Sequence, residues 1–325
     1  MLNRVVALDP RTYEHHHIHG EGRVWAETNC YVDIWIELLH SLGCEPVAAL
    51  PFTFAIDFEG DQWTFFKFPL PDLYDLYGLD VRELAIWGPL PAHIDEQVAR
   101  GNPVLVELDS FYLPDTEGSA YRRVHMKSTV AATEIDTDRR HLGYFHGRGF
   151  HVLEGDDFVD ALRLREPLDP AMLPPYAEFV KMRHPGRANG HSALATSLSL
   201  LRKHLGLAPV TNPFVAFRAR FERDLVDLLQ EDVESFHRYS FATLRQYGAC
   251  YELSATYLTW LARQGEQVED ARDAFQSVSE LTKTFQFQLA RAIVRGRPLD
   301  LSPLDVMAGQ WDRGMSELRA HYLLQ

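Results

Sequence analysis

Between residues 28 and 43, apolar side chains recur with the spacing of an amphipathic helix. The apolar positions are Tyr31, Ile34, Trp35, Leu38, Leu39 and Leu42. Thr28 and Asn29 both suit the N-cap position, and Gly43 is a typical helix end. The pattern predicts a helix that packs by one face and carries Cys30 in its first turn.

The rest of the first half mixes strand and short helix patterns. Apolar runs separated by tight polar turns predict a buried strand and then consecutive antiparallel strands, at residues 103–109, 125–136, 141–146 and 149–153. Aromatic residues on both sides of a polar turn predict a hairpin over residues 51–68. Short helices are expected at residues 70–79 and 93–101.

The second half has the pattern of a helical bundle. Long amphipathic stretches cover residues 193–207, 212–248, 249–265 and 273–296. Four prolines between Pro167 and Pro175 indicate a connection between domains. The fold class is therefore α+β, with a first domain at residues 1–166, in which a helix packs on an antiparallel sheet, and an all-α domain at residues 167–325.

Charge and composition exclude several classes of function. The 325 residues include 32 Lys and Arg against 46 Asp and Glu, a net charge of −14, which argues against nucleic-acid and anionic membrane partners. No apolar stretch is long enough for a bilayer span or a signal peptide, so we expect a cytoplasmic protein. Three widely spaced cysteines fit no disulfide framework and are expected to be free thiols.

Cys30 is the strongest candidate for chemistry. The start of a helix stabilises negative charge, so a thiolate is favoured there. A thiol nucleophile also needs a base, and His125, at the start of a predicted strand, is the best candidate. A cysteine at a helix start that faces such a histidine is the papain-like arrangement, and the third member then falls near His146 on the next strand.

Structural roles without chemistry are the alternative to these assignments. Cys44 follows a helix-ending glycine and Cys250 lies in a helical stripe, so both are expected to be structural. The histidines between Glu14 and Gly22, and the acidic turn at residues 57–61, fit no known metal-ligand spacing. We expect both segments to be solvated and predict no metal ligand. Cys30 itself fits the role of a small buried hydrophobe as well as that of a nucleophile.

The strings RVWAETNCYVDIWIELLH, FAIDFEGDQWTFFKF, LDSFYLPDT and YRRVH, with the C-terminal NPFVAF and FHRYSFATLRQYGACYEL, resemble one uncharacterised bacterial family, known only as a domain of unknown function. The resemblance covers nearly the whole chain. Members of that family are often encoded beside carrier proteins and amino-acid:carrier-protein ligases. The resemblance therefore implies an acyl or aminoacyl carrier protein as partner, with the loading ligase as a second candidate.

A more remote similarity extends to the butirosin-biosynthesis-protein-H-like acyltransferases, which have a papain-like domain followed by a helical domain. The shared outline implies Cys30, His125 and His146 as catalytic residues and Asp109, Tyr112 and Tyr121 near the substrate. The catalytic histidine of these relatives falls nearer Ser128, three residues beyond His125. Their oxyanion glutamine is replaced by Val24, which leaves Glu27, Asn29 or Gln62 as the donor.

Three functions follow as hypotheses. The first is a thiol-dependent acyltransferase that moves an aminoacyl group from a carrier-protein phosphopantetheine thioester to a small amine through a Cys30 acyl-enzyme; the phosphopantetheine belongs to the partner, and the chain itself binds no cofactor. The second is a cysteine peptidase or amidohydrolase with the same residues. The third is a non-catalytic protein that binds the carrier protein. Bound acyl groups and reactivity of Cys30 distinguish the first two from the third.

Overall fold

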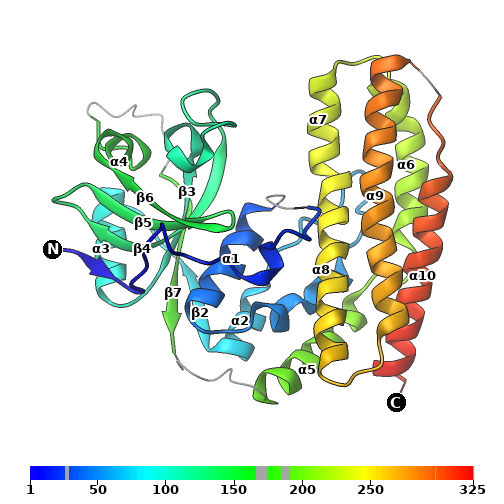
Figure 1. Cartoon of the computed structure of the whole chain (residues 1–325), viewed down its shortest axis with the longest axis horizontal. Helices are drawn as coiled ribbons and strands as arrows, with labels where there is room; N and C mark the ends of the chain where they lie inside the picture. The colour runs from blue at the N-terminus through cyan, green and yellow to red at the C-terminus, as the bar shows by residue number, and fades with distance from the viewer. Residues whose placement is uncertain (26–28, 166–173, 184–190, 297, 325) are drawn as a thin grey trace. The chain divides into compact units, whose positions relative to one another are not determined.

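The chain forms two compact units in a computed structural model that describes residues 1–25, 29–165, 174–183, 191–296 and 298–324 (Figure 1). The first unit comprises Met1–Gly20, Asn29–Pro46 and Pro69–Ser192. The second comprises Glu21–Thr28, Val47–Phe68 and Ala193–Gln325. Two segments of the N-terminal half thus belong to the helical unit.

The first unit is built on an antiparallel sheet. Its strands within the described residues are β1 (Asn3–Arg4), β2 (Leu79–Glu83), β3 (Val104–Asp109), β4 (Lys127–Asp136), β5 (His141–His146), β6 (Gly149–Glu154) and β7 (Ala177–Met182). The order is β2-β7-β3-β4-β5-β6, and β1 pairs with β4. β7 arrives last along the chain yet lies between β2 and β3, because β3 pairs with β7 through Val104–Val106.

Helices cover both faces of this sheet. They are α1 (Cys30–Ser41), α2 (Leu70–Tyr77), α3 (Leu90–Ala99) and α4 (Gly155–Ala161). One face packs against α3 and α4 in a core that includes Ile94, Val130 and Phe158. α1 packs against β4 and β5, and Figure 1 shows it on the side of the sheet away from α3 and α4.

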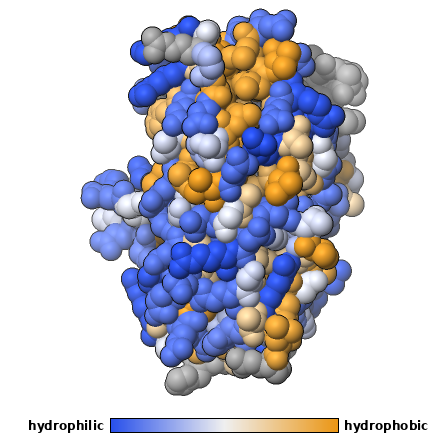
Figure 2. Space-filling view, turned by 90° about the vertical axis from the view of Figure 1, so that its right-hand side faces the viewer, coloured by the Kyte–Doolittle hydropathy of each residue, from blue (hydrophilic) through white to orange (hydrophobic). Residues whose placement is uncertain are grey.

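The second unit, apart from its two N-terminal segments, is helical. It contains α5 (His191–Leu207), α6 (Pro213–Leu228), α7 (Val233–Ala242), α8 (Leu244–Arg263), α9 (Glu269–Arg295) and α10 (Ser302–Tyr322). The longest of these helices pack side by side, α8 on α9 and α9 on α10. In Figure 2, apolar side chains gather toward the top of the view. Exposed apolar residues of α6, its C-terminal turn and α9 include Val226, Leu229, Phe287 and Val294.

The structure confirms the α+β class, the first helix with Asn29 as its N-cap, and the antiparallel strands. The hairpin predicted over residues 51–68 is confirmed only at its turn, where Phe58 and Trp63 form an antiparallel bridge. The first half of the segment is wrong, because Pro46–Ala55 forms a 3₁₀ segment instead of a strand. Aromatic residues of the segment also pack among the helices of the second unit; Trp63, for example, lies 4.8 Å from Tyr247 between ring centroids.

The expected domain boundary between residues 166 and 167 lies outside the described residues. β7 follows that position in the chain and belongs to the sheet. In the described ranges, none of the helices combines the length and apolarity that a bilayer crossing requires.

Candidate functional site

Cys30 is the first residue of α1, as the sequence predicts. The side-chain oxygen of Asn29 accepts a hydrogen bond from the Val32 N–H at 3.1 Å and so caps the helix. Asn29 is 2% exposed, whereas Cys30 is half-buried and its thiol is free. The thiol therefore lies at the N-terminal end of a 12-residue helix, where the helix dipole favours an anion. Asn29, predicted as a substrate-binding residue, has a structural role in this turn.

His125 and Asp109 form a hydrogen-bonded pair at the end of the sheet. The His125 Nδ1–H donates to Asp109 Oδ2 at 2.6 Å. The other carboxylate oxygen accepts from the backbone N–H of Phe111 and of Met126. The imidazole also stacks on Phe111, with 4.2 Å between ring centroids. Because the carboxylate accepts a hydrogen bond from the Nδ1–H, Nε2 of the neutral ring carries the lone pair that a general base needs.

The register places this pair on the sheet face that α1 covers. Cross-strand partners share a face, and residues four apart on one strand do as well. Asp109 therefore projects from the same face as Leu105 and its partner Glu178. Glu178 in turn accepts a hydrogen bond from the Tyr31 hydroxyl at 2.9 Å, next to Cys30. No hydrogen bond joins the Cys30 thiol to His125 within the described part of the chain.

His146 lies on the opposite face and does not orient His125. Ala131 pairs with Phe145 on the α1 face, so the next residue, His146, projects to the other side. Its Nδ1–H donates to Asp115 at 2.5 Å, and its Nε2 lies 2.7 Å from the Ser128 hydroxyl. The prediction that His146 orients His125 is therefore corrected, because Asp109 occupies that position.

Asp115 is held as an anion. Burial by itself would raise its pKa, but the hydrogen bond from His146 and the electrostatic influence of His146 and His151 lower it below the usual value. The Tyr144 hydroxyl also donates to Asp115. Burial and the neighbouring carboxylate raise the pKa of Tyr144, which keeps that hydroxyl protonated. Sequence reasoning missed Asp115 and Ser128 as site residues. The available signal for Ser128 is that it projects from the same face of the sheet as His146.

The remaining predicted substrate-binding residues are dispersed. The Tyr112 ring lies 6.2 Å from His125, so it borders the His125–Asp109 pair. The Tyr121 hydroxyl instead donates to Asp157 of α4 at 2.9 Å. Gln62 belongs to the second unit, where its carbonyl accepts from the Glu59 N–H. Glu27 lies outside the described residues.

The other two cysteines are poor nucleophiles. Burial raises the pKa of the Cys44 thiol to about 11. Burial also raises the pKa of Cys250, whose thiol donates to the Thr53 carbonyl at 3.5 Å. Both observations agree with the structural roles predicted for these residues, since the reactive species is the thiolate.

The histidine-rich segment is not a solvated loop, and that prediction is wrong. His19 is 1% exposed and lies between two carboxylates of α1, Asp33 and Glu37. Glu37 also accepts from the Tyr13 hydroxyl at 2.5 Å and from the His16 backbone N–H. Two acidic residues four apart on a helix face were the available signal. The described residues contain no cluster of three or more His, Cys, Asp or Glu side chains arranged to hold a metal.

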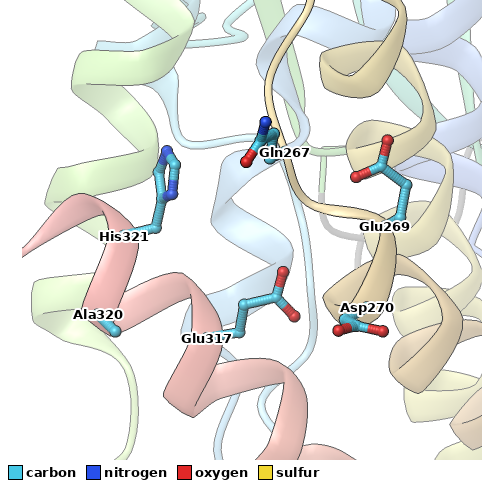
Figure 3. A pocket seen from close by; sticks show the side chains of 6 residues that line it. All are labelled: Gln267, Glu269, Asp270, Glu317, Ala320 and His321. Carbon is cyan, nitrogen blue, oxygen red and sulfur yellow. The ribbon is translucent and has the colours of Figure 1, made fainter.

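A cavity of about 630 Å³ lies in the second unit, near the start of α9 and the end of α10 (Figure 3). It is lined by Gln267, Glu269, Asp270, Glu317, Ala320 and His321. Figure 3 shows Glu317 and His321 projecting from α10 toward the segment with Gln267. Burial and the charge of Asp270 raise the pKa of Glu317. The lining is acidic and contains neither Cys30 nor His125 nor His146.

Comparison with protein families assigns both parts of the chain. Residues 14–182 match the model of the DUF1839 N-terminal domain, and residues 190–320 match that of the DUF1839 C-terminal domain. A comparison with curated proteins finds no match. Since the two models together span most of the chain, the protein belongs to the DUF1839 family, a family of unknown function.

Proposed function

We propose that the protein is a thiol-dependent acyltransferase in which Cys30 is the nucleophile, His125 the general base and Asp109 the group that orients His125. The observation that carries this proposal is the hydrogen bond between His125 Nδ1 and Asp109. A base oriented by a carboxylate, on the sheet face that carries a cysteine at a helix start, is the arrangement of a thiol nucleophile and its partners. The His125 side chain is 67% exposed, which leaves room for a substrate against its ring.

The reaction transfers the acyl group from a thioester donor to an amine acceptor through Cys30. His125 Nε2 takes the Cys30 proton, and the sulfur bonds to the carbonyl carbon of an acyl thioester. The thiol of the donor leaves with the proton from His125, and backbone N–H groups at the start of α1 stabilise the oxyanion. An amine then attacks the acyl-enzyme, loses its proton through His125, and the S–C bond breaks to return the Cys30 thiol.

The donor in this proposal is an aminoacyl thioester on the phosphopantetheine of a carrier protein in the cytoplasm. An acidic carrier requires basic side chains on this protein. Arg218 and Arg220 of α6 form ion pairs with carboxylates of their own unit, including the 2.6 Å pair of Arg220 with Asp224. We therefore place the docking contact on the first unit, near the exposed residues that flank His125, where Arg123 adds positive charge.

The test is incubation with aminoacyl carrier proteins and intact-mass detection of the acyl-enzyme. We expect an adduct on the wild type and on Cys44→Ala, and none on Cys30→Ala. His125→Ala and Asp109→Asn should slow its formation by about 10²–10⁴-fold, because they remove the base and its orientation. His146→Ala should form it at the wild-type rate, which separates the two histidine groups.

Three results decide between the hypotheses. An adduct that persists in folded Cys30→Ala contradicts the site assignment. If the acyl adduct is lost at the same rate with and without an added amine, water is the acceptor and the protein is a hydrolase. A carrier protein that binds equally well to the wild type and Cys30→Ala, without any adduct, identifies a non-catalytic partner.

A further inference from the structure

We infer that Ser128 is a second nucleophile, activated by His146 and Asp115, and that it accepts the acyl group of a small ester. The inference is independent of the function proposed for Cys30, because the three residues lie on the opposite face of the sheet. Ser128 is the second residue of β4, His146 ends β5, and Asp115 lies in the segment between β3 and β4. The chain thus brings a hydroxyl, an imidazole and a carboxylate into one line.

When His146 is neutral, the hydrogen bonds in this group have one direction. Asp115 is ionised, so it can only accept, and the Nδ1–H of His146 donates to it at 2.5 Å. A neutral His146 with its proton on Nδ1 has a lone pair on Nε2. The Ser128 hydroxyl therefore donates to Nε2 at 2.7 Å. This is the protonation state in which an imidazole removes a proton from a serine.

The surroundings suit a small apolar acyl group. Ser128 is 9% exposed, and the His146 side chain is 12% exposed, so each keeps a small contact with solvent. Leu108 lies directly opposite Ser128 in the sheet, and Leu113 and Val130 belong to the same apolar core. The Tyr144 hydroxyl donates to Asp115 and thereby fixes the carboxylate that orients His146.

The step balances without a cofactor. Ser128 Oγ bonds to the carbonyl carbon of the ester while its proton moves to His146 Nε2. The C–O bond to the alcohol breaks, and the alcohol leaves with that proton. Water then attacks the acyl-serine, gives a proton to His146, and releases the carboxylic acid as the Ser128 hydroxyl is restored.

A fluorophosphonate probe tests the inference directly, since it phosphonylates activated serines. We expect one adduct on the folded wild type, mapped to Ser128 by peptide mass spectrometry. Cys30→Ala should retain it, which separates this site from the proposed thiol chemistry. Ser119→Ala, which removes an exposed hydroxyl bonded only to the Thr116 carbonyl in the described residues, should retain it as well.

Variants of the triad give the second arm. Ser128→Ala should lose the adduct, and Asp115→Asn should slow labelling by about 10²–10⁴-fold. Asp115→Asn should also change the pH profile of the labelling rate, because the charge that forms on His146 during the reaction loses its counter-charge. A structural role of Asp115 would leave the pH profile unmoved.

The inference is overturned if the folded wild type remains unlabelled or if the label maps to another residue. It is also overturned if Ser128→Ala is labelled at the wild-type rate. Mapping on the wild type needs no variant, so a Ser128→Ala protein that fails to fold does not weaken the test. Hydrolysis of p-nitrophenyl acetate by Cys30→Ala should follow the same pattern across the variants.

Discussion

Two histidines of the sheet acquire their chemistry from a carboxylate that lies far from each in the sequence. His125 is held by Asp109 and His146 by Asp115. In both pairs the carboxylate accepts a hydrogen bond from the Nδ1–H and leaves Nε2 for a partner, and the two sites differ in what that partner is. His146 faces the Ser128 hydroxyl, whereas the exposed His125 faces solvent on the side of α1.

Asp115 gives a pH-dependent prediction at this scale. Its pKa in the folded chain is below the unfolded value, so ionised Asp115 stabilises the fold above about pH 4, and this stability is lost as the pH falls through the lowered pKa. Asp115→Asn should reduce the free energy of unfolding at pH 7 by about 1–3 kcal/mol, because a buried partner of His146 and Tyr144 is weakened.

Urea denaturation at pH 7, 5 and 3 measures this difference. The difference between the wild type and Asp115→Asn should narrow as the pH falls toward the lowered pKa of the wild-type carboxylate. A difference that does not change with pH would show that charge is not the cause. Asp9→Asn is the control, since Asp9 pairs with Arg11 at an exposed position and should change stability little.

The candidate site was only partly predictable from residue types. Cys30 could be placed in the first helical turn because the helix period and its cap are local signals. Asp109 could not be identified as the residue that orients His125, because the two side chains meet only when β3 and β4 pair. His146 was placed on the correct strand, but its face depends on registry with Phe145 and Ala131, which no local pattern fixes.

At the scale of elements, the segment before α1 is anchored in the helical unit by Trp25. The indole is 1% exposed and donates from Nε1 to Ser279 Oγ at 2.9 Å. The Trp25 backbone N–H donates to Glu252 at 3.1 Å. α8 comes close enough for this contact because residue 248 is glycine: a Cβ there would lie 2.5 Å from Trp25 Cζ2.

Gly248→Ala should therefore destabilise the protein although alanine favours helices. The added methyl group must displace a buried indole, which we expect to cost about 1–3 kcal/mol in the free energy of unfolding. Gly309→Ala in α10 is the matched control, since nothing lies within 4 Å of its Cβ position. Its free energy of unfolding should rise by about 0.5–1 kcal/mol, because alanine has a higher helix propensity than glycine. Equal effects of the two variants in chemical denaturation would contradict the packing argument.

Sequence patterns succeeded for elements whose signal is local and failed where packing decides. The helices at residues 70–79 and 93–101 have periodic apolar faces, and both formed as α2 and α3. The aromatic segment 51–68 has strand composition, yet its rings are buried among helices, so tertiary contacts override propensity. His19 looked solvated because its two carboxylate partners lie 14 and 18 residues away.

At the scale of the whole molecule, the chain contributes to its two units in an interleaved order. β7 pairs with both β2 and β3, although it follows the proline-rich segment that resembles a domain connection. Val47–Phe68 belongs to the helical unit, although it lies between α1 and α2 in the sequence. Each unit therefore depends on chain from both sides of residue 166.

Dividing the chain at residue 166 should consequently give two fragments that do not fold. The fragment of residues 1–166 lacks β7, so β2 loses its strand partner. The fragment of residues 167–325 lacks Trp63 and Phe58, which pack against Phe217 in the intact unit. We expect neither fragment to show a cooperative thermal transition by circular dichroism, because buried apolar surface is exposed in both. Adding a peptide of residues 47–68 to the second fragment should restore part of the transition. Two fragments that each unfold cooperatively without help would show that the units are separable at residue 166, and that the interleaved segments contribute little to stability.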